Sequence, residues 1–274
     1  MKIGKYNQAR VTDDLPQGFY LETEDGDRIL LPGSSAPENT QAGDTLRVFI
    51  YMDSEDRPIA TMKKPFAVAD SFAVLKVKEV NQFGAFLDWG IDKDLMLPFK
   101  QQLGELKPGD LCVVYILEDK LSGRLIATEK IKSFFDRDTK LLKPGQKVEL
   151  AAYEVTKEFA DFLVDYRYTG RLYLTGNEDI YIGDILSGYI QNIRDDGKIS
   201  VSLTPVGFRA VAENADIILD ALERAGGFLP FNDDTPPEVI RKEFGISKKT
   251  FKKMIGTLFR QEKIRIAENG IRLL

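Results

Sequence analysis

The sequence predicts a multidomain, mostly β protein, with three five-stranded barrels in tandem followed by a winged-helix domain. A pattern of alternating strands, charged turns and Gly-Asp pairs recurs three times, in units of about 65–75 residues. From about Phe208 onward, the hydrophobic period changes from two to 3.6 residues, which indicates helices. The predicted domains are barrel 1 (1–64), barrel 2 (65–131), barrel 3 (144–206) and the C-terminal domain (207–274).

The composition is that of an ordinary globular protein, and it excludes several classes of enzyme and metal site. Of the 274 residues, 43% are hydrophobic and 30% charged, and none is histidine. The lack of histidine excludes histidine-based catalysis and the commonest zinc ligands, and we predict no enzyme activity, cofactor or metal site. The lone Cys112 lies in an alternating apolar run and is expected to be a core thiol. Because no apolar run could span a membrane and no signal peptide is evident, a cytoplasmic location is expected.

The best-matched segment of each repeat has a Gly-Asp pair, an alternating strand, a charged turn, a basic residue and a second strand. The pairs are Gly43-Asp44, Gly109-Asp110 and Gly183-Asp184, and the basic residues are Arg57, Arg124 and Lys198. Short strands between turns at this spacing favour small antiparallel barrels of the oligonucleotide-binding (OB) type. Such barrels can also be purely structural, with no ligand.

The second repeat resembles a known RNA-binding domain. Its segments FGAFLDWG (83–90), LKPGDLCVVYIL (106–117) and GRLIATEK (123–130) are similar to the S1-type domain, a five-stranded barrel. With three such S1-like units and a basic helical C-terminus, the whole chain resembles the bacterial conserved virulence factor B (CvfB, YitL-like) family. The resemblance implies regulation of gene expression, virulence genes included, through RNA.

Barrel 2 contains two phenylalanines around a glycine, Phe83 and Phe86 with Gly84 between them. Gly84 is expected to allow a bulge that brings both rings to the outer face of the barrel. The residues expected to face the core are Ala85, Leu87 and Trp89. The resemblance implies that the two rings form a stacking platform for single-stranded RNA, where each stacked base contributes about 1–3 kcal/mol. The alternative is that both rings fill gaps within or between barrels.

The first two barrels have acidic surroundings at these positions. Barrel 1 has Gln17 and Tyr20 in place of the two rings and is expected to bind RNA poorly. Barrel 2 carries acidic residues at the same edge: Asp88, Asp92 and Asp94. The histidine usual in the S1-type family is replaced in barrel 2 by Leu97 or its neighbour.

Barrel 3 is the better candidate for binding RNA. Phe159 and Phe162 repeat the aromatic pair, and Tyr173 adds a ring at the position of Leu97. The basic residues around them are Lys157, Arg167, Arg171 and Lys198. Rings interleaved with guanidinium and ammonium groups are typical of grooves that bind single strands.

The C-terminal domain has the pattern of three helices and a hairpin. The first helix is expected to stop at Gly226-Gly227, and the second to open with a capping box of Thr235 and Glu238. The third begins at Ser247, and a hairpin turns at Asn269-Gly270. This order of elements predicts a winged helix.

The third of these helices carries a basic face. Its apolar stripe consists of Phe251, Met254, Ile255 and Leu258, and the opposite side holds Lys249, Lys253 and Arg260, flanked by Lys252 and Lys263. Residues 244–274 contain eight basic and two acidic side chains, although the whole chain has a net charge of −5. Recognition helices occupy this place in DNA-binding winged helices, so we expect contact with nucleic acid. The alternative is an ordinary solvated face.

The leading prediction is a non-catalytic RNA-binding protein that regulates gene expression after transcription. It would act as a cytoplasmic monomer on single-stranded RNA, through barrel 3 and the C-terminal domain. The ribosome or RNA-processing proteins are further predicted partners, and no membrane partner is predicted. The predicted RNA-binding residues are Phe83, Phe86, Arg124, Lys157, Phe159, Phe162, Arg171, Tyr173, Lys198, Lys249, Lys252, Lys253 and Arg260.

Two other interpretations stay open. In one, the C-terminal domain belongs to a DNA-binding transcription regulator, and the barrels are protein-interaction modules. In the other, the chain is a protein adaptor on the ribosome or a ribonuclease. The carboxylate pairs that could hold Mg²⁺ for a nuclease, Asp92 with Asp94 and Asp195 with Asp196, lie in charged turns and are expected to be solvated.

Overall fold

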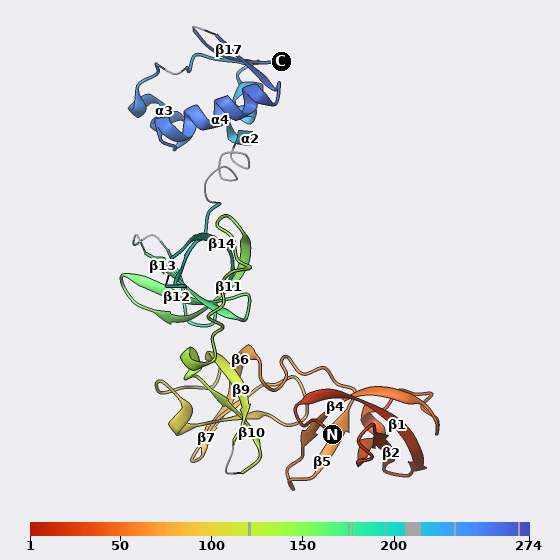
Figure 1. Ribbon diagram of the computed structural model, residues 1–274. Helices are drawn as coiled ribbons and strands as arrows, with labels where there is room; N and C mark the ends of the chain where they lie inside the picture. The colour runs from red at the N-terminus through yellow and green to blue at the C-terminus, as the bar shows by residue number, and fades with distance from the viewer. Residues whose placement is uncertain are drawn as a thin grey trace. The chain divides into compact units, whose positions relative to one another are not determined.

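The computed structural model of the chain describes residues 1–119, 122–174, 176, 178–194, 196–205, 215–232, 234–267 and 269–274. Three closed five-stranded barrels follow one another along the chain, and a C-terminal domain of helices and a three-stranded sheet comes last (Figure 1). The predicted fold class is therefore confirmed. Within the described ranges, none of the helices has the length and apolar character needed to cross a bilayer.

The three barrels share one topology. Barrel 1 contains β1 (Lys5–Leu15), β2 (Gly18–Thr23), β3 (Arg28–Pro32), β4 (Thr45–Met52) and β5 (Pro58–Thr61). Barrel 2 contains β6 (Phe72–Asn81), β7 (Gly84–Leu87), β8 (Leu95–Pro98), β9 (Leu111–Glu118) and β10 (Leu125–Thr128). Barrel 3 contains β11 (Lys147–Val155), β12 (Phe159–Val164), β13 (Tyr168–Tyr173), β14 (Ile185–Ile193) and β15 (Ile199–Ser202). The strand order of barrel 1, β1-β2-β3-β5-β4, recurs at the equivalent strands of barrels 2 and 3. Within the described residues, 3₁₀ turns follow three of the strands: η1 (Gly33–Ser35), η2 (Phe99–Gln101) and η3 (Ile131–Ser133).

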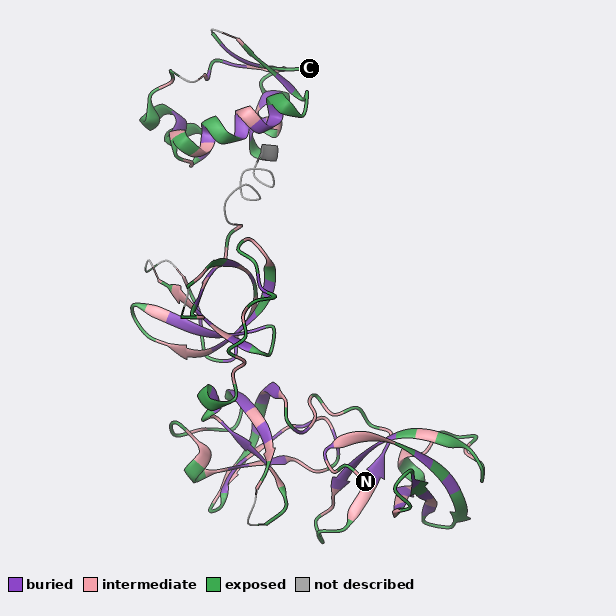
Figure 2. Ribbon diagram, in the orientation of Figure 1, coloured by how far each residue is buried: buried purple, intermediate pink, exposed green. Residues whose placement is uncertain are grey.

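Buried side chains fill the barrels from the inward positions of the strands, with exposed residues between them (Figure 2). In barrel 2, Ala85, Leu87 and Trp89 lie in the core, as predicted. Cys112 is also fully buried there, and burial raises the pKa of its thiol to about 12. It is a core thiol, as its alternating run predicts.

The repeated Gly-Asp pairs make the same backbone bonds in all three barrels. The Gly109 N–H donates to the Val77 carbonyl at 2.8 Å, and the Val77 N–H donates to the Asp110 carbonyl at 2.9 Å. The equivalent bonds join Gly43 and Asp44 to Val11, and Gly183 and Asp184 to Ala152. Gly109 has φ +100°, a conformation that side chains disfavour. The motif therefore recurs because it ties the loop before the fourth strand to the first strand.

The bulge predicted at Gly84 lies elsewhere. The register shifts between Val77 and Glu79 on β6, and equivalent shifts interrupt β1 and β11. Gly84 instead opens β7 at φ +151°, where a Cβ atom would lie 2.4 Å from the Leu97 carbonyl oxygen. The prediction was wrong because the extra residue is on the partner strand, and Gly84 is required by the close approach of β8.

Barrels 1 and 2 share part of one core. The ring of Phe49 in β4 contacts that of Trp89 edge to face, with centroids 5.4 Å apart. The indole N–H of Trp89 donates to the carbonyl of Ala67, in the segment between the two barrels, at 2.8 Å. An ion pair between Lys63 and Asp92 adds to the contact. Apolar packing of this kind joins the two barrels.

The segment after barrel 2 packs against that barrel through one buried isoleucine and two phenylalanines. Ile131 is buried, Phe134 stacks on Tyr115 with centroids 3.9 Å apart, and Phe135 stacks on Phe72 at 5.5 Å. Phe135 also lies 5.5 Å from the Tyr153 ring of β11. Residues 131–135 therefore form a packed connector.

The C-terminal domain contains α2 (Ala215–Arg224), β16 (Phe228–Leu229), α3 (Pro237–Phe244), α4 (Lys248–Arg260), β17 (Ile264–Ala267) and β18 (Gly270–Leu273). Its core includes the predicted stripe of α4, and the Ser247 hydroxyl caps α4 by accepting the Thr250 N–H at 3.1 Å. The capping box predicted for α3 is wrong, because the Thr235 hydroxyl accepts the Asn232 N–H at 2.9 Å instead. Residues 206–214, where the change of period begins, lie outside the described residues.

Candidate nucleic-acid interface

One part of the outer surface of barrel 3, called the Arg171 face below, is formed by the neighbouring strands β12 and β13. Their register pairs Phe159 with Tyr173 and Asp161 with Arg171, so the four side chains lie on one face of the sheet. Tyr173 is 64% exposed and Phe159 half-buried. Two aromatic side chains and one guanidinium therefore lie together on this face.

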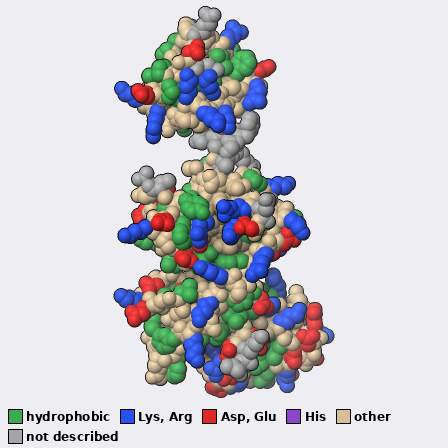
Figure 3. Space-filling view, turned by 60° about the vertical axis from the view of Figure 1, so that its left-hand side comes forward, with side chains coloured by type: hydrophobic (Ala, Val, Ile, Leu, Met, Phe, Trp, Pro, Cys, Tyr) green, Lys and Arg blue, Asp and Glu red, His purple; other side chains and the backbone are tan. Residues whose placement is uncertain are grey.

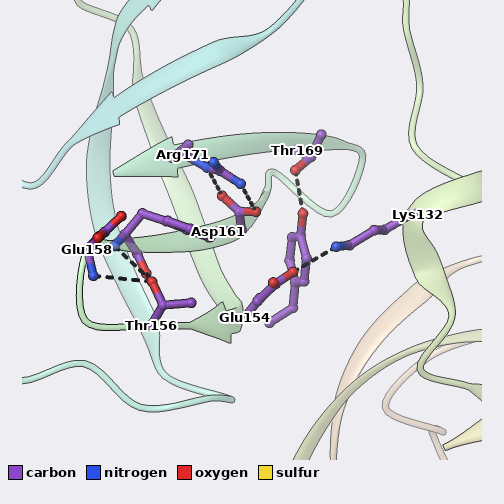
Figure 4. A network of polar contacts seen from close by, with 9 residues as sticks. Lys132, Glu154, Thr156, Glu158, Asp161, Thr169 and Arg171 are labelled. Atoms are coloured by element: carbon purple, nitrogen blue, oxygen red, sulfur yellow. Dashed lines mark hydrogen bonds and ion pairs between the residues drawn. The ribbon is translucent and has the colours of Figure 1, made fainter. Parts of the chain in front are cut away.

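Arg171 is fixed in this face by the Asp161 carboxylate (Figure 4) and by the Phe159 ring. Its Nε atom donates to Asp161 Oδ1 at 2.6 Å, and a terminal nitrogen donates to Asp161 Oδ2 at 2.7 Å. Its guanidinium carbon lies 3.7 Å from the Phe159 ring centroid. The hydrogen bonds that Arg171 donates to Asp161 raise the pKa of Arg171. Because Asp161 is nearly buried, the guanidinium is held in one place.

Phe162 lies in the core of barrel 3 and not on this face. Its side chain is fully buried, and so is that of Ala160. The register places Phe162 opposite Gly170, in the position that Leu87 has in barrel 2, so the two Phe-x-x-Phe segments differ by one residue. Stacking on Phe162 is therefore impossible in this structure, and the ring that accompanies Phe159 is Tyr173.

The other basic residues predicted in barrel 3 have separate surroundings. Lys157 is exposed in the β11–β12 turn, and Lys198 pairs with Asp196 at 3.1 Å in the β14–β15 turn. Arg167 pairs with Asp136, the residue after the connector, at 2.5 Å. Beside the Arg171 face, the Tyr153 hydroxyl and Thr169 Oγ1 are 2.7 Å apart, and Lys132 pairs with Glu154 (Figure 4). Burial raises the pKa of Tyr153 to about 12, so the hydroxyl stays protonated.

In barrel 2, both predicted rings reach the outer face. Phe83 is 59% exposed, Phe86 is half-buried, and both line a pocket. Arg124 lines the same pocket and forms an ion pair with Asp56 of barrel 1. Barrel 1 has Tyr20 at the Phe86 position, and the Arg28 guanidinium covers that ring at 4.2 Å from its centroid.

The acidic pairs considered for Mg²⁺ are held by lysines. Asp92 pairs with Lys63, and Asp94 pairs with Lys78 at 2.8 Å. Asp195 lies outside the described residues. Among the residues that the structure describes, no group of three or more potential metal ligands occurs.

The outer side of α4 carries the predicted basic face of the C-terminal domain, called the α4 face below. Lys249, Lys252, Lys253 and Arg260 are all exposed, and Lys and Arg side chains are spread over the visible face of this domain (Figure 3). Apart from its chain neighbours and the backbone of α4 itself, no atom of the described residues lies within 4 Å of a Cβ built on Gly256, so the middle of this face is open. Sequence reasoning missed Phe259, which is 52% exposed at the edge of the basic face. The signal was an aromatic residue outside the apolar stripe of an amphipathic helix.

Comparison with known proteins agrees with this architecture. Residues 3–63 and 71–130 match the S1 domain family, and residues 216–273 match the CvfB-like winged helix domain family. A Bacillus subtilis (strain 168) protein named "Uncharacterized protein YitL" is 28% identical over 98% of this chain and 93% of its own length. "Conserved virulence factor B" of Staphylococcus aureus (strain USA300) is 25% identical over 93% of this chain and 88% of its own length.

One solved structure is similar to this chain over nearly its whole length. It is the crystal structure of a multidomain protein with nucleic acid binding domains from Streptococcus pneumoniae TIGR4. The two chains are 25% identical with a TM-score of 0.51, and the match covers 99% of this chain and 98% of the other.

Proposed function

We propose that this chain, which contains S1 domains and a CvfB-like winged helix domain, is a non-catalytic protein that binds single-stranded RNA. It binds through barrel 3 and the C-terminal domain and regulates gene expression after transcription, as a monomer in the cytoplasm. The S1 match and the nucleic acid binding domains named for the pneumococcal structure support nucleic acid as the ligand. The similarity to conserved virulence factor B supports a regulatory role.

One observation carries the choice of unpaired RNA, namely the exposed Tyr173 ring beside Phe159 and the Arg171 guanidinium. Bases in a duplex stack on one another, whereas unpaired bases are free to stack on aromatic rings and guanidinium planes. Tyr173 thus presents an exposed ring on which an unpaired base can stack. The face therefore fits single strands better than duplexes.

The α4 face supports the same proposal. Its lysines would bind phosphates without reading sequence, and this contribution weakens as salt increases. Duplex DNA is read mostly by Arg, Asn and Gln side chains that form paired hydrogen bonds with base edges. The α4 face has Arg260 but no Asn or Gln between Lys248 and Arg260, and it places the exposed Phe259 ring at its edge. Lysines with an aromatic side chain favour single strands.

A second candidate is a DNA-binding transcription regulator, with the barrels as protein-interaction modules. The observation that favours it is the position of α4, because DNA-binding winged helices use this helix for recognition. In that case α4 would bind duplex DNA, and barrel 3 would contribute nothing to nucleic acid binding.

The two candidates are separated by binding the intact protein to fluorescent oligouridine, with duplex DNA of equal length as competitor, at low and moderate salt. RNA binding that excess duplex DNA fails to displace is the expected result. Preferential binding to the duplex, with a dependence on its base sequence, would overturn the RNA proposal in favour of the DNA-binding regulator.

A further inference from the structure

An apolar pocket of about 390 Å³ lies where barrel 3 packs against barrel 2. The two barrels touch at its edge, because a Cβ atom on Gly183 would lie only 2.3 Å from the Cβ atom of Leu111. Its volume is at the small end of the range for ligand pockets, about 300–1,000 Å³, so it has room for one or two side chains of a partner. Barrel 2 contributes Leu103, Leu106, Leu111 and Val113 to the lining, and barrel 3 contributes Tyr153 and Ile182.

Three of these apolar side chains remain exposed to water. Leu103 is 66% exposed, Ile182 49% and Leu111 41%. Single exposed leucines are common in proteins, but apolar side chains gathered around one pocket and rimmed by polar residues are typical of sites where another protein binds. The packing of barrel 3 on barrel 2 thus leaves an apolar surface that neither barrel covers.

The charged residues that line the pocket are acidic. They are Glu105, Asp110 and Glu129, and among the described residues no lysine or arginine lines it. Asp110 already accepts the Lys107 N–H at 2.7 Å, whereas the Glu105 side chain is exposed without such a bond. Carboxylates repel a phosphate and attract a guanidinium or an ammonium group. The charge of the lining therefore favours a basic segment of a protein over RNA.

Glu129 is an ionisable side chain that the barrel itself does not require. It directly follows the last strand of barrel 2, and the residues that directly follow the last strands of barrels 1 and 3 are Met62 and Leu203. Its Oε2 atom accepts the Leu103 N–H at 2.8 Å, and among the described residues no hydrogen bond reaches Oε1. Burial raises the pKa of Glu129, so keeping this carboxylate ionised costs stability. A cationic side chain in the pocket would pair with Oε1 and offset that cost.

We infer that this pocket binds an extended segment of a partner protein, with one arginine side chain of the partner beside Glu129. Large apolar residues next to that arginine cover the exposed leucines and isoleucine of the pocket. The Tyr153 ring in the lining favours arginine over lysine, because a planar guanidinium also packs on aromatic rings. The inference adds a protein-binding site and does not depend on RNA binding by the Arg171 face or the α4 face.

The test selects phage-displayed random heptapeptides on the intact protein and measures binding of the most enriched peptide, synthesised with a fluorescent label. The pocket variants are Glu129→Gln, which removes a charge whose burial costs stability, and Ile182→Ser, which changes a half-exposed side chain. The matched controls are Glu118→Gln and Leu141→Ser, since both side chains are exposed and lie outside the pocket. Binding of fluorescent oligouridine is measured for every variant.

Enriched peptides should carry an arginine next to large apolar residues. Each pocket variant should bind the peptide about 10-fold more weakly or worse, the effect expected from losing one charge-assisted hydrogen bond or one covered isoleucine. Both controls should bind the peptide like the wild type, and all four variants should bind oligouridine like the wild type.

The inference is overturned if no peptide is enriched, if the enriched peptides lack arginine, or if Glu129→Gln binds the peptide as tightly as the wild type does. It is also overturned if the pocket variants change oligouridine binding and no peptide is enriched, because the pocket then serves RNA. If the wild type binds the peptide as expected but binds no oligouridine, the proposed function falls and this inference stands.

Discussion

The guanidinium of Arg171 lies 3.7 Å from the centroid of the Phe159 ring, on the outer face of barrel 3. Arg28 and Tyr20 form a similar contact in barrel 1, at 4.2 Å. In each barrel a carboxylate holds the arginine, Asp161 in barrel 3 and Asp13 in barrel 1. Because Arg171 is already positioned, a base that stacks beside it does not have to order a long side chain first.

Phe162→Ala should destabilise barrel 3 by about 3–5 kcal/mol, since it removes a fully buried ring from a closed core. Phe159→Ala should cost less than about 2 kcal/mol, because it mainly loses the contact with Arg171. Hydrogen exchange of β12 peptides in the intact protein measures both effects. Equal protection in the two variants would contradict the burial of Phe162.

Gly84→Ala should destabilise barrel 2 by at least about 1–3 kcal/mol, the cost of an unfavourable backbone conformation alone. The new methyl group would also meet the Leu97 carbonyl oxygen at 2.4 Å. Urea unfolding followed by Trp89 fluorescence measures the change. Gly104→Ala is the control, because nothing lies within 4 Å of its Cβ, and it should change stability by less than about 0.5 kcal/mol. Comparable losses in both variants would argue against a specific role for Gly84.

Glu129→Gln should stabilise barrel 2 at neutral pH. Burial raises the pKa of Glu129, so the folded state binds more protons than the unfolded state as pH rises above the ordinary value for glutamate. The stability due to this group is present at low pH and lost as pH rises through the raised pKa. Glutamine has no charge to bury and can still accept the Leu103 N–H, which Glu129 accepts at 2.8 Å. Unfolding at pH 4 and pH 7 should show a gain only at pH 7, and a gain of equal size at both would contradict the account.

The repeats and the change of hydrophobic period were sufficient to predict three barrels and a winged helix, because both follow from local patterns. The burial of Phe162 could not be predicted from the sequence. Phe159 and Phe162 have the same spacing as Phe83 and Phe86, yet Phe86 lies on the outer face of its barrel and Phe162 in the core. Strand register depends on the partner strand, and a shift of one residue moves every side chain to the other face. The bulges lie on β6 and β11, where glycine does not mark them.

The pocket beside Phe83 also lay beyond sequence reasoning, since it requires Tyr51 and Met52 of barrel 1. Contacts between domains leave no periodic signal in either segment. Phe259 was missed for another reason. The prediction for α4 considered only its charged side chains and its apolar stripe, and the exposed Phe259 ring belongs to neither.

Replacing Lys249, Lys252 and Lys253 with Gln should reduce the salt dependence of RNA binding. Each phosphate contact with a single strand contributes about 0.7 to the slope of log affinity against log salt concentration, so three lost contacts reduce it by about 2. Titrations at several salt concentrations measure the slope. A control triple variant changes the exposed lysines Lys2, Lys64 and Lys107. If the control reduces the slope by as much, the effect reflects net charge and not a contact made by α4.

The most direct test of the account compares binding of fluorescent oligouridine to the intact protein and to its Tyr173→Ala variant. Tyr181→Ala is the matched control, because Tyr181 is 65% exposed in the same barrel but lies outside β12 and β13. The account predicts binding weakened by about 5- to 100-fold for Tyr173→Ala, from the loss of one stacked base, and unchanged binding for the control. Wild-type affinity in the Tyr173→Ala variant would contradict the assignment of the Arg171 face as the RNA-binding surface of barrel 3.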